Sequence, residues 1–239
     1  DPIRLRAIYL RGVALATLDR DSEAAAALAP LEAIDRSTLA DESTVHMVDA
    51  AQLLLGETRL SAGDAAGAAS ALQRLVDDDG LARLPSAAAS TALLRLGEAC
   101  IAAQRWSGAE EAFLRHRTRF PEDPHWFQAA FGAGLAQERQ ERHDAAIASY
   151  RMVVERHDGV TAARARFHIG ECLYALGRLD DAVREFLKVD LLHANSEWSA
   201  AALYEAGRCL VEQERLADAR AQFERVLDND AAVLAELVR

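Results

Sequence analysis

The stretch FHIGECLYALGRLDDAVREFLKV, residues 167–189, decides the fold because its pattern of small and large residues recurs along the chain. Gly170 is followed by Ala182 twelve residues later and by Phe186 four residues after that. A fixed period of this kind is the signature of a repeat protein, in which each unit packs against its neighbours. The pattern begins at six glycines: Gly12, Gly56, Gly97, Gly134, Gly170 and Gly207.

Three further columns align with these repeat glycines. Alanine stands twelve residues after each of them, at Ala24, Ala68, Ala109, Ala146, Ala182 and Ala219. A large apolar residue stands sixteen residues after each, at Leu28, Leu72, Phe113, Tyr150, Phe186 and Phe223. The residues nineteen after each glycine are also apolar, with one histidine as the exception: Leu31, Leu75, His116, Val153, Val189 and Val226.

Each copy reads as two helices joined by a short polar turn, such as ALGRLDDA at residues 175–182. Alanine, the strongest helix former, is frequent, and no alternating apolar runs indicate strands. The sequence therefore predicts an all-α fold. Small residues at the glycine and alanine columns would let the paired helices approach closely. Successive repeat glycines are 44, 41, 37, 36 and 37 residues apart, which predicts lengthened helices or loops in the first two repeats.

One unit, LLRLGEACIAAQRWSGAEEAFLRH at residues 93–116, resembles the tetratricopeptide repeat. Gly97, Ala109, Phe113 and the closing Pro121 stand at that family's offsets, although the family's tryptophan four residues before the glycine is missing. The resemblance covers almost the whole chain and implies a right-handed superhelical solenoid of helix-turn-helix repeats. The alternative is a HEAT-like array, whose period of about 40–47 residues leaves the alanine and aromatic columns unexplained.

The chain is predicted to form a single array over residues 1–239. The predicted repeats span residues 5–38, 49–82, 90–123, 127–160, 163–196 and 200–228. Residues 229–239, NDAAVLAELVR, are expected to form a further amphipathic helix. This helix is either a cap on the end of the stack or the start of a seventh repeat.

Composition excludes several classes of partner and site. The net charge is −11, and Lys188 is the only lysine, so a nucleic-acid partner is not expected. No run of eighteen apolar residues predicts a membrane span. The three cysteines, Cys100, Cys172 and Cys209, show no CxxC spacing and are interpreted as small buried apolar residues. No cofactor and no metal site are predicted.

The family resemblance implies that the first helix of each repeat lines the concave face. Aromatic residues among polar ones are typical of peptide recognition, and they gather on this face in repeats 4 to 6. Apolar residues stand three positions before each glycine, and the alternative interpretation of them is packing alone: Tyr9, Leu53, Leu94, Phe131, Phe167 and Tyr204. The first repeat is nearly apolar on this face, which suggests that something covers it. The predicted partner-binding groove consists of Gln128, Phe131, Glu138, Phe167, His168, Glu171, Tyr174, Tyr204 and Arg208.

These features predict a non-catalytic scaffold that binds a protein or peptide segment with basic and apolar side chains. A self-assembling array that forms a homo-oligomer through its end repeats is the alternative, and a helical α/α-type enzyme is a third. The chain contains no GxSxG, P-loop or HExxH motif. His168 and Cys172 have metal-capable spacing, but the sequence predicts no third ligand. Glu57, Glu98 and Glu171 recur one residue after their glycines and are interpreted as solvated groove charges.

Two observations on the compartment point in different directions. The spacing of 36 to 37 residues is similar to that of bacterial tetratricopeptide proteins of the cell envelope, including those of the Tol-Pal system and of outer-membrane assembly. That likeness favours the periplasm or cell envelope. The unpaired cysteines favour the cytoplasm, where thiols stay reduced.

Overall fold

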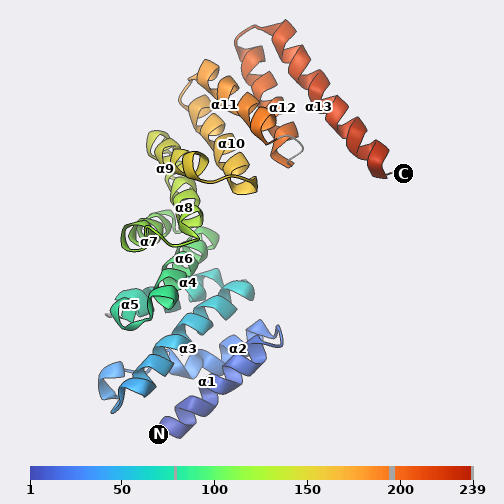
Figure 1. Ribbon diagram of the computed structural model, residues 1–239. Coiled ribbons are helices and arrows are strands. Elements are labelled where there is room, and N and C mark those ends of the chain that lie inside the picture. The colour runs from blue at the N-terminus through green and yellow to red at the C-terminus, as the bar shows by residue number, and fades with distance from the viewer. Residues whose placement is uncertain (78–79, 194–196, 238–239) are drawn as a thin grey trace. The chain divides into compact units, whose positions relative to one another are not determined.

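The computed structural model describes residues 1–77, 80–193 and 197–237, and this part of the chain folds into α-helices and two short 3-10 helices (Figure 1). The first seven α-helices are α1 (Pro2–Ala16), α2 (Asp21–Leu28), α3 (Glu42–Ser61), α4 (Ala65–Asp77), α5 (Gly80–Arg83), α6 (Ser86–Ala102) and α7 (Trp106–Arg119). They are followed by α8 (Trp126–Glu138), α9 (His143–Arg156), α10 (Val160–Ala175), α11 (Leu179–Leu192), α12 (Glu197–Glu212) and α13 (Leu216–Leu237). The predicted all-α fold is confirmed.

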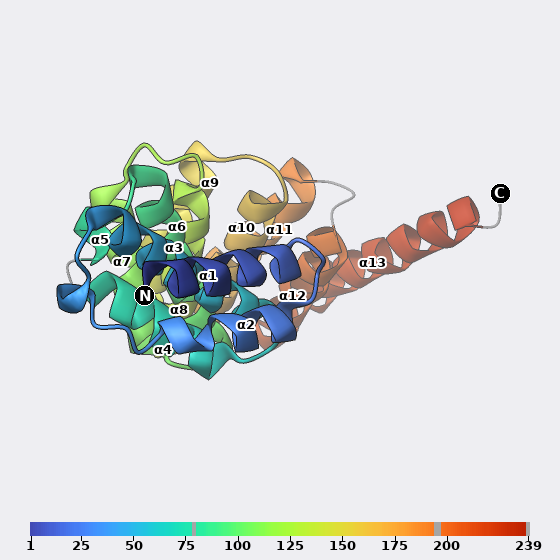
Figure 2. The same cartoon turned by 90° about the horizontal axis from the view of Figure 1, so that it is seen from below.

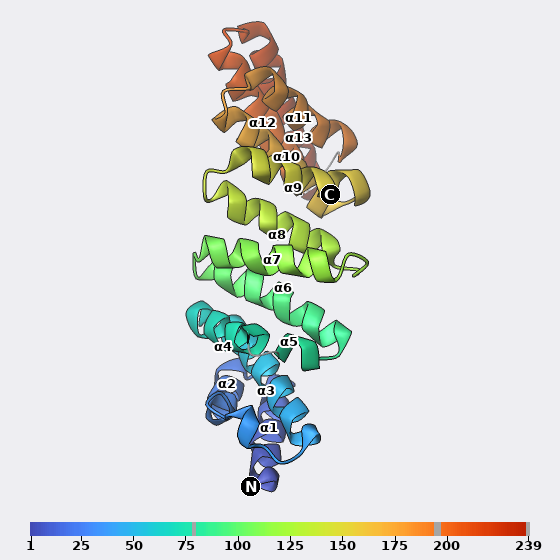
Figure 3. The ribbon, with the colours of Figure 1, turned by 90° about the vertical axis from the view of Figure 1, so that its left-hand side faces the viewer.

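The chain divides into two compact units, Asp1–Gly132 and Ala133–Arg239. In the first unit α1 packs on α2, α3 on α4 and α6 on α7. Figure 2 shows the first of these pairs side by side, and Figure 3 shows the last. In the second unit α10 packs on α11 and α12 on α13, while α9 contacts α10 and α11 contacts α12. This pairing of each helix with its sequence neighbours is that of a helical repeat solenoid.

The repeat glycine and the large residue sixteen positions later meet in every repeat. A methyl group placed on Gly97 would lie 2.4 Å from the Phe113 ring, and one on Gly170 would lie 2.5 Å from the Phe186 ring. Both distances are far below van der Waals contact, so the ring occupies the space that any other residue's side chain would need. The same close approach recurs in the other repeats: Gly12 with Leu28, Gly56 with Leu72, Gly134 with Tyr150, and Gly207 with Phe223.

The turn between the two helices of each repeat contains one residue with a left-handed backbone, seven positions after the glycine. In the fifth repeat this residue is Gly177, with φ of 70°. The next amide, that of Arg178, donates to the carbonyl of Leu173 at 2.9 Å, which closes a Schellman-type helix end. Glycine also occupies the site in the second repeat, whereas the other four repeats place a polar residue there: Asp19, Gln104, Glu141 and Glu214.

The long intervals of the first two repeats have a structural origin. Residues between α2 and α3 form two 3-10 helices, η1 (Ala29–Leu31) and η2 (Arg36–Thr38), and α3 itself is 20 residues long. The short helix α5 is inserted between α4 and α6. The additional residues therefore lie at the junctions between repeats and leave the spacing within each helix pair unchanged.

The C-terminal segment differs from the expectation of a separate helix over residues 229–239. Helix α13 continues from Leu216 to Leu237 without a break. Residues 228–230 are Asp-Asn-Asp, and this sequence contains no glycine or proline that would end the helix. Residues 238–239, and residues 194–196 at the end of the predicted fifth repeat, lie outside the described residues. No helix in the described part of the chain is both long enough and apolar enough to span a membrane.

Three buried thiols and one buried imidazole lie in the core. Cys100, Cys172 and Cys209 are free and at most 1% exposed, which confirms their interpretation as buried apolar residues. Burial raises the pKa of all three thiols, that of Cys209 to about 11. A buried thiol with a raised pKa carries little reactive thiolate at neutral pH.

His116, the exception in its apolar column, is fully buried and held by a small polar network. Its Nε2 lies 2.9 Å from the Ser90 hydroxyl, which donates in turn to Asp123 at 2.6 Å. Because the Ser90 proton is directed at Asp123, Nε2 is the protonated nitrogen and Nδ1 is left without a hydrogen-bond partner. Burial lowers the pKa of His116, so the imidazole is neutral in the folded protein.

The contact between glycine and ring can be tested in the last repeat, where Phe223 is half-buried and its removal is tolerated best. Gly207→Ala should lower the free energy of unfolding by about 1–2 kcal/mol, because the added methyl group overpacks against the ring. The same change in a Phe223→Ala background should be neutral or stabilising, because alanine favours helix by about 1 kcal/mol once the ring is gone. Chemical denaturation of the four proteins measures this coupling, and equal effects in the two backgrounds would contradict the contact.

A second prediction concerns the pH dependence of stability. The unfolded chain gains a proton on His116 as the pH falls through about 6.5, whereas the folded protein resists protonation because its pKa is lower. Stability is therefore lost as the pH falls, by up to about 1.4 kcal/mol per pH unit from this group. His116→Leu should reduce this loss between pH about 7.5 and about 5.5 in denaturation experiments. An unchanged pH slope in the variant would show that His116 is not the titrating group.

Candidate functional site

A cavity of about 600 Å³ opens in the first unit between α1, α3 and the segment of α5 and α6. Apolar side chains of Tyr9, Val13, Leu53 and Leu54 line it. Tyr9 and Leu53 stand three residues before Gly12 and Gly56, and Val13 directly follows Gly12. The cavity therefore lies on the first-helix face, at the positions where the family resemblance implies partner contacts.

A buried carboxylate organises one edge of this cavity. Asp49 on α3 is 0% exposed and forms ion pairs with Arg36 of η2 and Arg83 of α5, the latter at 3.0 Å. Arg36 also donates to the side-chain carbonyl of Gln52. The segments inserted in the first two repeats are thereby attached to α3, and Arg83, 30% exposed, reaches the cavity with its charge compensated.

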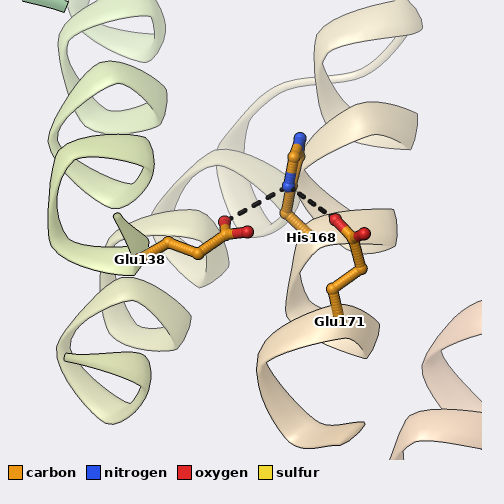
Figure 4. Close-up of side chains that lie close together, drawn as sticks. All are labelled: Glu138, His168 and Glu171. Atoms are coloured by element: carbon orange, nitrogen blue, oxygen red, sulfur yellow. Dashed lines mark ion pairs between the residues drawn. The ribbon is translucent and has the colours of Figure 1, made fainter. Parts of the chain in front are cut away.

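In the second unit, Glu138, His168 and Glu171 form a cluster between α8 and α10 (Figure 4). His168 Nδ1 lies 3.2 Å from Glu138 Oε2 and 2.9 Å from Glu171 Oε2. The His168 ring stacks on Tyr150, with 5.4 Å between centroids and 19° between planes. The Tyr150 hydroxyl donates to Glu138 Oε2 at 2.6 Å, so one aromatic residue orients both the imidazole and a carboxylate.

The electrostatics of this cluster follow from burial and from the shared nitrogen. Burial acts to lower the pKa of His168, but hydrogen bonding to Glu138 and Glu171 and their charges outweigh it and raise the pKa to about 8. Burial acts to raise the pKa of Glu138, and the interactions with His168 and Tyr150 lower it overall. At neutral pH the cluster therefore holds one imidazolium between two carboxylates.

A more exposed surface extends over α10 and α12. Tyr204 is 50% exposed and packs one side of its ring near Phe223, with 5.9 Å between centroids. Arg208 lies over the Tyr174 ring, with its Cζ 5.7 Å from the centroid, and the Tyr174 hydroxyl donates to Glu212 at 2.8 Å. This surface offers aromatic edges next to charges that are already paired within the chain.

The predicted groove residues have different environments in the structure. Phe131 and Phe167 are each only 8% exposed. Phe167 packs near Phe186 and Trp198, with ring centroids 5.4 Å and 5.2 Å apart. Gln128 is exposed but belongs to the first unit together with Phe131. The structure brings Glu138, His168 and Glu171 into direct contact, and it links Arg208 to Tyr174.

The recurring glutamates are ion-paired. Arg95 lies 3.5 Å from Glu57 of the preceding repeat and 2.7 Å from Glu98 of its own. Arg95 stands two residues before its repeat glycine, which is also the position of His168. Arg95 in the first unit and His168 in the second unit therefore each lie between a carboxylate of their own repeat and a carboxylate of the preceding repeat.

Sequence reasoning missed the cavity and the pairing of His168 with Glu138. The signal for the cavity was present in the apolar first-helix face of the first repeat. The sequence spacing pairs His168 with Cys172, four residues away, but Cys172 is 1% exposed and is not among the three converging side chains. His168 stands two residues before Gly170, and Glu138 stands four residues after Gly134 of the preceding repeat. An alignment of adjacent repeats would therefore have suggested this pair.

Stacked helical hairpins with glycine, alanine and aromatic contacts at fixed offsets define a helical-repeat protein. The tetratricopeptide repeat profile matches residues 50–124, 131–192 and 190–233. The chain belongs to the tetratricopeptide repeat family. The first predicted repeat, residues 5–38, lies outside the matched ranges.

Solved structures with the same fold include MamA and YrrB. A crystal structure of MamA protein superposes with a TM-score of 0.65 at 17% identity, covering 77% of this chain and 92% of that chain. YrrB, described as a TPR protein with an unusual peptide-binding site, superposes with a TM-score of 0.58 at 20% identity, covering 75% and 84%. No curated protein sequence matches the chain. At these identities the likeness shows the fold.

Proposed function

We propose that the chain is a non-catalytic protein-interaction scaffold whose first helices bind a peptide or protein segment. The cavity of about 600 Å³ in the first unit carries this proposal. Its size suits one or two bulky side chains, and its apolar lining with charged groups at the edge has the composition of a recognition pocket. Tetratricopeptide arrays present extended binding surfaces on this face, and YrrB is described as having a peptide-binding site.

The partner chemistry follows from the side chains that line this face. Tyr9, Leu53 and Leu54 favour an apolar anchor residue, because burial of an aromatic or aliphatic side chain supplies most of the energy in such contacts. Glu57 at the cavity favours a basic neighbour in the bound segment. The net charge of −11 increases the association rate of basic partners through long-range attraction.

The second unit supplies a further part of the proposed surface. Tyr174, Tyr204 and Arg208 are its accessible members, and Glu138, His168 and Glu171 lie beside them on the first helices. Phe167 is buried and contributes to this proposal by packing beneath the exposed residues, whereas Phe131, also buried, belongs to the first unit. Gln128 remains a proposed contact of the first unit.

The binding proposal can be tested with peptides selected from a random display library on the full chain. Selected peptides should combine apolar and basic residues. Leu53→Glu should weaken cavity-binding peptides at least tenfold, or about 1.4 kcal/mol, because it places a charge in the apolar lining. Tyr204→Ala should do the same for peptides that bind the second unit. Calorimetry measures the affinities, and circular dichroism checks that each variant is folded.

The matched control is Leu216→Glu, which makes the same change at a leucine that is 65% exposed on a second helix. This variant should bind every selected peptide like the unmodified chain. The proposal is wrong if the library yields no binders, or if the binders are indifferent to both Leu53→Glu and Tyr204→Ala.

Self-assembly is a second candidate function, favoured by exposed apolar residues on α1. Ile3 is 80% exposed and Leu10 is 53% exposed. If this helix forms an interface between copies, the mass measured by light scattering should rise with protein concentration. The double variant Ile3→Glu, Leu10→Glu should then keep the mass of one chain. A single-chain mass at all concentrations for the unmodified protein contradicts self-assembly and leaves the binding proposal intact.

A further inference from the structure

The cluster of Glu138, His168 and Glu171 has the donor atoms of a metal site. One ring nitrogen and two carboxylate oxygens converge, and the three atoms lie within 4.8 Å of one another. The ligands come from two helices, since Glu138 ends α8 while the other two residues lie one turn apart on α10 (Figure 4). We infer that this cluster binds a divalent transition-metal ion of the Zn²⁺ type.

The distances fit an ion placed between the three donors. Around a four-coordinate Zn²⁺ with bonds of about 2.0–2.2 Å, neighbouring ligand atoms lie about 3.3–3.6 Å apart. His168 Nδ1 is already 3.2 Å from Glu138 Oε2 and 2.9 Å from Glu171 Oε2. The two carboxylate oxygens lie within 4.8 Å of each other, so movements of up to about 1 Å, within the freedom of two glutamate side chains, would seat the ion. It would take the place of the proton on Nδ1.

The surroundings hold two of the donors in place. Tyr150 is fully buried, stacks on the imidazole and donates its hydroxyl proton to Glu138 Oε2. Hydrogen bonds of this kind orient metal-binding carboxylates and raise metal affinity about 10–100-fold. The third ligand, Glu171, is 42% exposed at its side chain, so the site is open to solvent and can complete its coordination with water.

Comparison with the equivalent positions shows that the donor set belongs to one junction. Arg95 stands where His168 does, between Glu57 and Glu98, but a guanidinium stays protonated and cannot ligate a metal. The chain thus has a permanent cation at the junction of the second and third repeats and an imidazole at the junction of the fourth and fifth repeats. Only the imidazole can exchange its proton for a metal ion.

The test is a titration of the metal-free full chain with Zn²⁺, followed by calorimetry. The expected result is one ion per chain. Glu138→Gln, Glu171→Gln and His168→Arg should each weaken binding at least tenfold, and Tyr150→Phe should weaken it by about tenfold through the lost hydrogen bond. His168→Arg reproduces the residue found at the equivalent position in the third repeat, so it should keep the fold while removing the ligand.

Two control variants separate this site from other zinc ligands. Glu98→Gln changes the glutamate at the equivalent repeat position, and Cys172→Ser removes the nearby thiol; both should bind Zn²⁺ like the unmodified chain. Titration with Co²⁺ adds a spectroscopic readout, because its d–d bands report nitrogen and oxygen ligands without thiolate charge transfer. The inference is overturned if the unmodified chain binds no Zn²⁺, or if binding is unchanged in Glu138→Gln, Glu171→Gln and His168→Arg. Loss of binding in Cys172→Ser would also overturn it.

Discussion

The contact between each repeat glycine and the large side chain sixteen residues later determines how the two helices of a repeat can pair. The absent side chain leaves room for a leucine, phenylalanine or tyrosine to lie against the glycine backbone, which brings the helices close together. The left-handed residue seven positions after the glycine turns the chain back at a constant place. Turn and contact therefore depend on each other, since a turn of another length would move the large residue away from its glycine.

The sequence was sufficient for the fold because every element of this contact lies within one repeat. Phe186 follows Gly170 by sixteen positions, with Ala182 between them, so this spacing can be read without knowing how the repeats stack. His116 shows where this reasoning ends. Its partners, Ser90 and Asp123, come from a different helix and from a loop, and no period relates them. A polar residue in an apolar column is understood only when its three-dimensional neighbours are known.

The candidate sites were predicted less completely for the same reason. The sequence predicts that the first helices form the binding face, but the exposure of a side chain on that face depends on the next repeat. Phe167 is covered by Trp198 and by Phe186, whereas Tyr204, at the same offset, is half exposed. Likewise, Arg95 and His168 each contact a glutamate of the preceding repeat, and this contact is seen only when adjacent repeats are placed together.

Asp49 has a consequence for how this sequence can vary in evolution. Its carboxylate holds Arg36 and Arg83, which lie in the two segments that lengthen the first repeats. Shortening one segment to the usual repeat length would remove one of these two arginines, and shortening both would leave the buried carboxylate without a counterion. Relatives of this protein that lack both insertions are therefore expected to carry an uncharged residue in place of Asp49, whereas relatives that keep one insertion can retain the aspartate.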